Sequence, residues 1–219
     1  MKDRENEGTL PGPAVFTAPH SRRLFLKGMG LAAGATAILP TVAVGQNADA
    51  ETEEIPGLKI LGRGEQKVTL KVNGASRTVA IEPRETLLNV LRTKLGLTGS
   101  KEVCDRGTCG CCTVLLDGAS IVSCLMLAID AVGHEVTTIE GVADDPKNAA
   151  LIDAFCEHDA AQCGYCIPGI VVRSSALLDE NPAPTAEEIR QGLSGNICRC
   201  GTYTKIFDAV GSVSKGGRT

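Results

Sequence analysis

The amino-acid sequence predicts an α+β protein of two small domains, a sheet domain followed by a bundle of four helices. Its 219 residues are enough for one or two domains, and 43% hydrophobic with 22% charged residues is ordinary globular composition. Alternating β-branched residues characterise the chain from residue 67, whereas apolar residues at helical spacing characterise it from residue 147. Ten cysteines fall in two groups, one in each region.

The composition argues against a nucleic-acid partner. Aromatic residues make up only 3% of the chain and tryptophan is absent, so a stacking surface for single strands is not expected. The formal net charge of −4 gives no basic face for a phosphate backbone.

The N-terminal region has the character of an export signal. Ser21–Lys27 (SRRLFLK) precedes a charge-free run from Gly28 to Gln46, and a basic pair, an apolar stretch and small residues are the parts of such a signal. The first segment resembles the twin-arginine export consensus, which implies a periplasmic protein exported after folding and cofactor loading. The run is too weakly hydrophobic for a stable membrane span, although an uncleaved anchor remains the alternative. Cleavage is predicted after Gly45 or after Ala50, and we favour the second.

Two β-hairpins are predicted in the sheet domain. The first, residues 67–82, turns at Asn73-Gly74, and the second, residues 113–123, turns at Asp117-Gly118. Alternating β-branched residues on both sides of such a pair are typical of a hairpin. A further strand is predicted at His134–Ile139.

One helix and a cysteine loop separate these hairpins. Thr86 caps an apolar repeat from Leu87 to Leu95, which Gly96 stops. The order strand, strand, helix, loop and strands is that of a β-grasp ferredoxin.

Four short helices are predicted in the second domain, which suggests a helical bundle. They are Asn148–His158, Ile170–Leu178, Thr185–Leu193 with a Thr-x-x-Glu capping box, and Tyr203–Val213. One cysteine pair precedes the second helix and another precedes the fourth, so both pairs are expected to converge on one site. Helix dipoles and free N–H groups at these N-termini favour a negatively charged thiolate cluster.

The spacing of the first cysteine group indicates iron and sulfur. Cys104-x4-Cys109-x2-Cys112 followed by Cys124 has the plant-type spacing for a [2Fe–2S] cluster. Glycines between these cysteines permit the positive φ angles of a loop that wraps a cluster.

Disulfides and zinc are the alternatives to clusters. Disulfides are the ordinary state of cysteines in an exported protein, but the adjacent Cys111 and Cys112 could pair only with strain. Cys198 and Cys200 are one residue apart and meet the same difficulty. Zinc stays open for the second group, because C-x2-C together with C-x-C can hold it tetrahedrally.

Three motifs together resemble the small iron–sulfur subunit of the xanthine dehydrogenase/aldehyde oxidase family of molybdenum hydroxylases. They are residues 104–125 (CDRGTCGCCTVLLDGASIVSCL), residues 162–169 (QCGYCIPG) and residues 194–203 (SGNICRCGTY). The resemblance extends from about Val68 to Val213. With the export signal, the chain looks most like the subunit of a periplasmic aldehyde oxidoreductase.

The resemblance implies a β-grasp domain and a four-helix domain, each with one [2Fe–2S] cluster. The ligands that it implies for the first cluster are Cys104, Cys109, Cys112 and Cys124. Those that it implies for the second are Cys163, Cys166, Cys198 and Cys200. Gln162 and Cys200 match family positions that lie against the pterin of the molybdenum cofactor.

The resemblance also implies partners. Catalysis would take place in a large molybdenum-cofactor subunit, and this chain would pass electrons through its clusters to FAD in a further subunit or to an external acceptor. The alternatives from other classes are a free-standing ferredoxin-like redox protein and a zinc- or disulfide-stabilised binding module.

The chain departs from the family pattern at Cys111, usually Ala, and at Val103, usually Gly. We expect the thiols of Cys111 and Cys112 both to lie near the iron, and we assign Cys112 as the ligand because it preserves the spacing. Cys156 is expected to be an unliganded buried thiol, and His158 a surface or interface residue. The predicted boundaries are 1–50 for the signal region, 51–66 for a linker, 67–142 for the sheet domain, 143–214 for the helical domain and 215–219 for a flexible tail.

Overall fold

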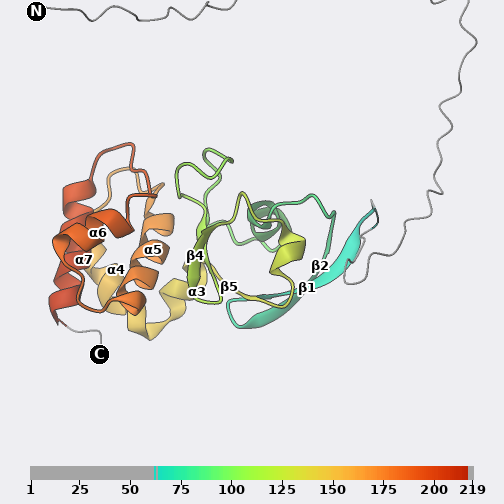
Figure 1. Ribbon diagram of the computed structural model, residues 1–219, viewed down its shortest axis with the longest axis horizontal. Helices are drawn as coiled ribbons and strands as arrows, with labels where there is room; N and C mark the ends of the chain where they lie inside the picture. The colour runs from blue at the N-terminus through green and yellow to red at the C-terminus, as the bar shows by residue number, and fades with distance from the viewer. Residues whose placement is uncertain (1–61, 63, 217–219) are drawn as a thin grey trace, which may run out of the picture. The chain divides into compact units, whose positions relative to one another are not determined.

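The computed structural model describes residue 62 and residues 64–216 (Figure 1). The predicted signal region and most of the predicted linker lie outside the described residues, as do residues 217–219 of the predicted tail. The last helix, α7 (Tyr203–Gly216), extends two residues into that tail.

A five-stranded mixed sheet forms the first domain. Its strands are β1 (Gln66–Val72), β2 (Ala75–Ile81), β3 (Thr113–Leu116), β4 (Ala119–Val122) and β5 (Glu135–Thr137). The strand order is β2-β1-β5-β3-β4. Strand β1 is parallel to β5, and the other pairs are antiparallel. This arrangement confirms the α+β prediction with a β-grasp sheet.

Both hairpins turn where the sequence predicts. Asn73 and Asp117 adopt left-handed φ angles of 52° and 49°, which short polar side chains tolerate better than others. The third predicted segment is shorter than expected: β5 ends at Thr137, because Ile139 already begins a helix, α3 (Ile139–Asp144).

The predicted helix of the sheet domain is present but irregular. Helix α2 (Leu87–Asn89) continues as a π-helical segment over Val90–Lys94, and the Thr86 hydroxyl accepts a hydrogen bond from the Asn89 N–H. Apolar side chains of this segment pack on the sheet and form the core of the domain. The fully buried members include Leu70, Ile81, Leu87, Val90, Leu91, Val114 and Val136.

The second domain contains the four predicted helices. They are α4 (Ala149–Glu157), α5 (Ile167–Glu180), α6 (Ala186–Gly192) and α7. Helix α5 begins three residues before the predicted start, because Pro168 is accommodated in the first turn. The predicted capping box is formed between Thr185 and Glu188. In the part of the chain that the structure describes, no helix combines the length and the apolarity that crossing a bilayer requires.

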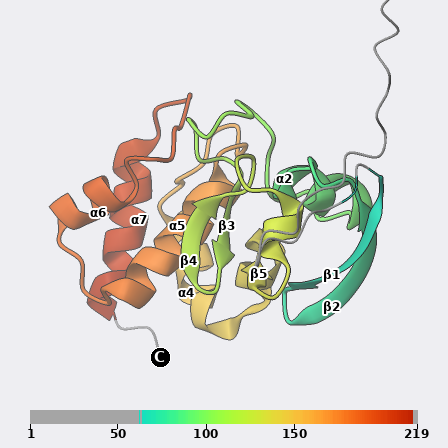
Figure 2. The same ribbon diagram turned by 45° about the vertical axis from the view of Figure 1, so that its right-hand side comes forward.

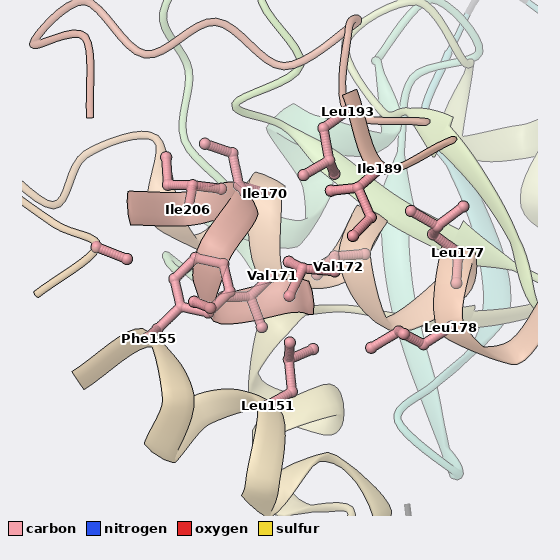
Figure 3. Close-up of a cluster of buried hydrophobic side chains, with 14 of the residues drawn as sticks. Leu151, Phe155, Ile170, Val171, Val172, Leu177, Leu178, Ile189, Leu193 and Ile206 are labelled. Atoms are coloured by element: carbon pink, nitrogen blue, oxygen red, sulfur yellow. The ribbon is translucent and has the colours of Figure 1, made fainter. Parts of the chain in front are cut away.

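The helices enclose an apolar core of their own. Figure 3 shows Phe155 of α4, Ile170 and Val172 of α5, and Ile206 of α7 pointing toward one another. Each of these side chains is at most 6% exposed. Burying a large aliphatic side chain contributes about 1.5–3 kcal/mol, so this core fixes the helix N-termini that carry cysteines.

The two domains meet where α5 lies against β3 and β4 (Figure 2). Cys109, Cys111 and Leu115 of the sheet domain belong to the apolar cluster of the helical domain. A side chain at Gly169 would overlap the Gly110 carbonyl oxygen and approach the Cys111 Cα within 3.1 Å. The contact between α5 and the first cysteine loop is therefore a backbone-to-backbone contact.

Asn73 connects the first hairpin to the start of the segment that leads into the helical domain. Its side-chain nitrogen donates to Thr138 Oγ1 at 2.9 Å, and its side-chain oxygen accepts from the Thr138 N–H at 2.9 Å. Thr138 also donates to Glu140 Oε2, while Glu140 Oε1 accepts from the Gly99 N–H. This network ties three loops together below the cysteine loop.

We predict that Asn73→Gly lowers the free energy of unfolding by about 1–3 kcal/mol, the cost of leaving a buried N–H without an acceptor. Thr138 is completely buried, and glycine keeps the left-handed turn, so the change isolates the lost side-chain bonds. Denaturant unfolding of the cluster-loaded protein measures the effect. Asn181→Ala is the control, because the Asn181 side chain accepts from the Ala183 N–H and contacts Glu188 in an exposed turn; equal effects of both variants would contradict the prediction.

Candidate metal centres

The first cysteine loop lies between the π-helical segment and β3, and Cys124 follows β4. Gly107 and Gly110 adopt φ angles of 71° and 70°, a region that glycine enters at little cost. These turns aim backbone N–H groups at the thiols: the Gly107 N–H lies 3.2 Å from Cys124 Sγ and the Thr108 N–H lies 3.3 Å from Cys104 Sγ. The loop is therefore built to stabilise negative charge on sulfur.

The electrostatics of this loop differ from one thiol to the next. The Arg106 N–H, with help from the N–H groups of Cys109 and Thr108, lowers the pKa of Cys104 to about 6. Burial raises the pKa of Cys124 to about 11 in spite of the Gly107 N–H. Bound iron deprotonates a coordinating thiol outright, so the N–H groups become donors to cluster ligands.

The four cysteines of this loop are arranged as two pairs. The thiols of Cys104 and Cys109 are hydrogen-bonded to each other, and so are those of Cys112 and Cys124. A [2Fe–2S] cluster is held by four cysteine thiolates, two on each iron. The donor set and its pairing fit such a cluster.

The second group repeats this arrangement at two helix N-termini. Cys166 is the N-cap residue of α5, and Cys198 and Cys200 lie in the turn before α7. The Cys166 thiol is hydrogen-bonded to that of Cys198, and the Cys163 thiol to that of Cys200. The structure thus brings together both predicted pairs.

The two pairs of the second group differ in exposure. Cys166 and Cys198 are buried, whereas Cys163 and Cys200 are exposed. Burial raises the pKa of Cys166 to about 12. For Cys198, burial also raises the pKa, but the hydroxyl and N–H of Thr202 outweigh it and bring the pKa to about 7. Gln162, one residue before Cys163, is exposed as well.

No disulfide joins any two of the cysteines in the structure. All ten cysteines are free thiols. Within the described residues, no three or more His, Cys, Asp or Glu side chains gather as the ligands of one metal ion.

Cys111 and Cys112 belong to different groups of packed side chains, but the Cys111 thiol also contacts that of Cys109, a candidate ligand, so the expectation that both thiols lie near the iron stays a prediction. Cys112 packs with Cys124 and Leu88 in a small cluster of the sheet domain. Cys111, 5% exposed, packs into the apolar core of the helical domain. The side chains of these two adjacent residues therefore pack in different parts of the protein.

Two further expectations concern α4. Cys156 is exposed rather than buried, because the buried face of α4 consists of Leu151, Ala154 and Phe155, so the prediction was wrong. His158 is partly exposed at the C-terminal end of the helix.

A contact between the two cysteine loops has no signal in the sequence. Ile197, next to Cys198, donates its N–H to the Cys109 carbonyl at 2.9 Å. Asn196 is 6% exposed, and its side-chain nitrogen donates to the Gly110 carbonyl at 2.9 Å. An asparagine beside a glycine ordinarily indicates a turn, so nothing in the local pattern marks a contact between domains.

Comparison with known proteins identifies the same two modules. Residues 70–129 match the 2Fe-2S iron-sulfur cluster binding domain family, and residues 138–211 match the [2Fe-2S] binding domain family. The chain is 48% identical to the nicotinate dehydrogenase small FeS subunit of Eubacterium barkeri over 65% of this chain and 91% of that one. It is 38% identical to the aldehyde oxidoreductase iron-sulfur-binding subunit of Escherichia coli O157:H7 over 87% of this chain and 86% of that one.

A solved structure supports the fold. A chain of quinoline 2-oxidoreductase from Pseudomonas putida 86 superposes with a TM-score of 0.65 and 41% sequence identity. The match covers 71% of this chain and 99% of that one.

We predict that Cys111→Ala retains both clusters, whereas Cys112→Ala loses the first one. Cys111→Ala removes only a buried thiol from an apolar contact, which costs roughly 1 kcal/mol, and leaves four ligands at unchanged spacing. Iron analysis of the purified protein should give about four Fe per chain for wild type and Cys111→Ala, and about two for Cys112→Ala. Loss of the first cluster in Cys111→Ala would show that the ligand assignment is wrong by one residue.

Proposed function

Since this chain belongs to the family of small iron–sulfur subunits of molybdenum hydroxylases, we propose that it serves an exported, aldehyde-oxidising member of that family. Its electron-transfer role and its two [2Fe–2S] sites are those of the family, in which catalysis belongs to another subunit. The relatives named above are all subunits of larger enzymes, which gives no support to a free-standing ferredoxin or a binding module.

The extent of one alignment carries the proposal of an aldehyde substrate. The nicotinate dehydrogenase subunit and the aldehyde oxidoreductase subunit of Escherichia coli K12 each align with 65% of this chain, but the aldehyde oxidoreductase subunit of Escherichia coli O157:H7 aligns with 87%. Residues 61–219 are less than three quarters of the chain, so the longer alignment must include part of the N-terminal region. Two aldehyde oxidoreductase subunits are among the relatives, and the alignment of one of them into the N-terminal region supports an exported, aldehyde-oxidising enzyme.

The chain's own residues hold two redox groups and control their exposure. When bound, a [2Fe–2S] cluster takes up and releases electrons, and its potential depends on hydrogen bonds to sulfur and on solvent exposure. The N–H groups of Gly107 and Thr108 supply such hydrogen bonds in the sheet domain. Thr202 does so for Cys198 in the helical domain, where the two side chains lie 3.3 Å apart.

The exposure of the thiols supports a direction of transfer. The exposed pair, Cys163 and Cys200, lies beside Gln162 on the outside of the helical domain, where we propose that the molybdenum pterin of a large subunit docks. The buried pair, Cys166 and Cys198, lies toward the sheet domain. We propose that electrons leave through the sheet-domain site to FAD in a further subunit or to an external acceptor.

We propose that the protein is exported to the periplasm by the twin-arginine route. The support comes from Ser21–Lys27 and the charge-free run that follows, together with the alignment into the N-terminal region. Loading of clusters before export fits a route for folded proteins, because ligand cysteines exposed to an oxidising compartment would form disulfides.

We predict that replacing Arg22 and Arg23 together by lysine blocks export and leaves precursor in the cytoplasm. The charge is unchanged, but the planar guanidinium donors are lost. Cell fractionation with an antibody against the chain measures the distribution. Arg4→Lys, a conservative change outside the motif, is the control and should not alter export; unimpaired delivery of the double variant to the periplasm would refute the route.

A second prediction tests the enzyme and the direction of transfer. With an aldehyde added to the purified complex, rapid-freeze electron paramagnetic resonance should show the helical-domain signal before the sheet-domain signal. Gln162→Ala should slow this first reduction about tenfold, as loss of an outer contact to a metal centre commonly does, with unchanged iron content.

The matched control is Gln191→Ala, an exposed glutamine whose side chain bonds only Glu187 within α6 among the described contacts. In this variant, the helical-domain cluster should be reduced at the wild-type rate. Earlier appearance of the sheet-domain signal would overturn the direction, and reduction by nicotinate but not by aldehydes would overturn the substrate class.

A further inference from the structure

We propose that Asn196 is a positioning residue for electron transfer between the two cluster sites. Its side chain lies between the domains, is 6% exposed, and hydrogen-bonds Gly110 and Thr113. It acts on the backbone of the first cysteine loop. The inference rests on the electron-transfer role of the chain and is independent of the substrate, the export route and the final acceptor.

The Asn196 amide closes a small buried network. Its nitrogen donates to the Gly110 carbonyl at 2.9 Å and lies 3.3 Å from Thr113 Oγ1. The Thr113 hydroxyl donates to the same Gly110 carbonyl at 2.6 Å. A buried amide nitrogen without acceptors would be costly, so the two loops are held at the separation at which these bonds form.

The next residue makes the link between the candidate ligands. The Ile197 N–H donates to the Cys109 carbonyl at 2.9 Å. Ile197 is bonded to Cys198, so a chain of covalent bonds interrupted by a single hydrogen bond joins one ligand residue of each site. This hydrogen bond forms only while the two loops keep their relative position. The Asn196 side chain holds that position.

The absence of a side chain at position 110 leaves room for the Asn196 amide. A Cβ atom on Gly110 would lie 2.5 Å from the Gly195 carbonyl oxygen and 2.6 Å from the Asn196 side-chain nitrogen. Gly110 also has a φ of 70°. Glycine at position 110 therefore lets the Asn196 side chain reach a backbone carbonyl that any other residue would shield.

Apolar packing does not fix this part of the junction. A cavity of about 400 Å³ adjoins the network and is lined by Gly110, Thr113, Ser120, Arg173 and Asn196, among others. Arg173 spans it and donates to Ser120 Oγ at 3.1 Å. With open space on one side, directional hydrogen bonds rather than close packing determine the distance between the loops.

The test uses Asn196→Ala in the purified, cluster-loaded complex with both clusters reduced by dithionite. The variant should keep about four Fe per chain and both rhombic signals. The magnetic interaction between the two reduced clusters, read as signal splitting or faster spin relaxation, should become weaker or more widely distributed, because it falls steeply with separation. Hydrogen exchange of the Ile197 amide should become about tenfold faster or more.

Ser194→Ala is the matched control. Ser194 is exposed in the same loop, and its hydroxyl donates to the Gln191 carbonyl within the helical domain, so magnetic interaction and amide exchange should both stay at wild-type values. Unchanged interaction and exchange in a fully loaded Asn196→Ala protein would overturn the proposal.

If Asn196→Ala loses iron, Thr113→Val decides the question. It keeps the shape of residue 113 but removes the hydroxyl from the network, and a smaller change in the same direction is expected. Wild-type behaviour of Thr113→Val would then overturn the proposal. Dithionite reduces the clusters without substrate, so failure here is distinguishable from failure of the proposed aldehyde activity or export.

Discussion

The backbone contact between α5 and the first cysteine loop is the constraint on which the arrangement of both metal centres depends. Gly169 has no side chain, and this lets the first turn of α5 lie directly on Gly110 and Cys111. Cys166 caps the same turn, so the contact brings one ligand residue of the second site next to the loop of the first. Apolar packing within the sheet domain and within the four-helix core supports this contact from both sides.

The thiol sites show how a small protein accommodates concentrated negative charge. In the absence of iron, burial raises the pKa of Cys124 and Cys166 to about 11 and 12, so folding alone does not favour four thiolates in one place. Iron supplies the compensating charge, and metal affinity thereby becomes part of the stability of the fold. The backbone N–H groups of the first loop and the N-termini of α5 and α7 supply further compensation without a cationic side chain.

Local features of the sequence predict the helices, strands and turns well. They do not predict the contacts between residues that are distant in the sequence. The turns at Asn73-Gly74 and Asp117-Gly118 and the cap at Thr86 follow from the chemistry of a few neighbouring residues, and all are confirmed. The exposure of Cys156 depends on which face of α4 is covered by other helices, and the early end of β5 depends on the start of α3 at Ile139; no local pattern encodes either. Ligand spacing predicts which cysteines come together, but the contact of Asn196 with Gly110 joins residues 86 positions apart.

The opposite orientations of Cys111 and Cys112 explain how a fifth cysteine is tolerated beside a four-thiol site. Cys112 turns toward Cys124, whereas Cys111 turns toward the helical core, where a free cysteine behaves as a small apolar side chain. Burial and the neighbouring Cys109 raise the pKa of Cys111 to about 12. A ligand thiol in a similar environment is deprotonated by the iron that it binds, whereas Cys111 contacts the Cys109 thiol from outside the proposed set of four ligands. The β-strand that begins at Thr113 then enforces this alternation, because it fixes the backbone immediately after the two cysteines.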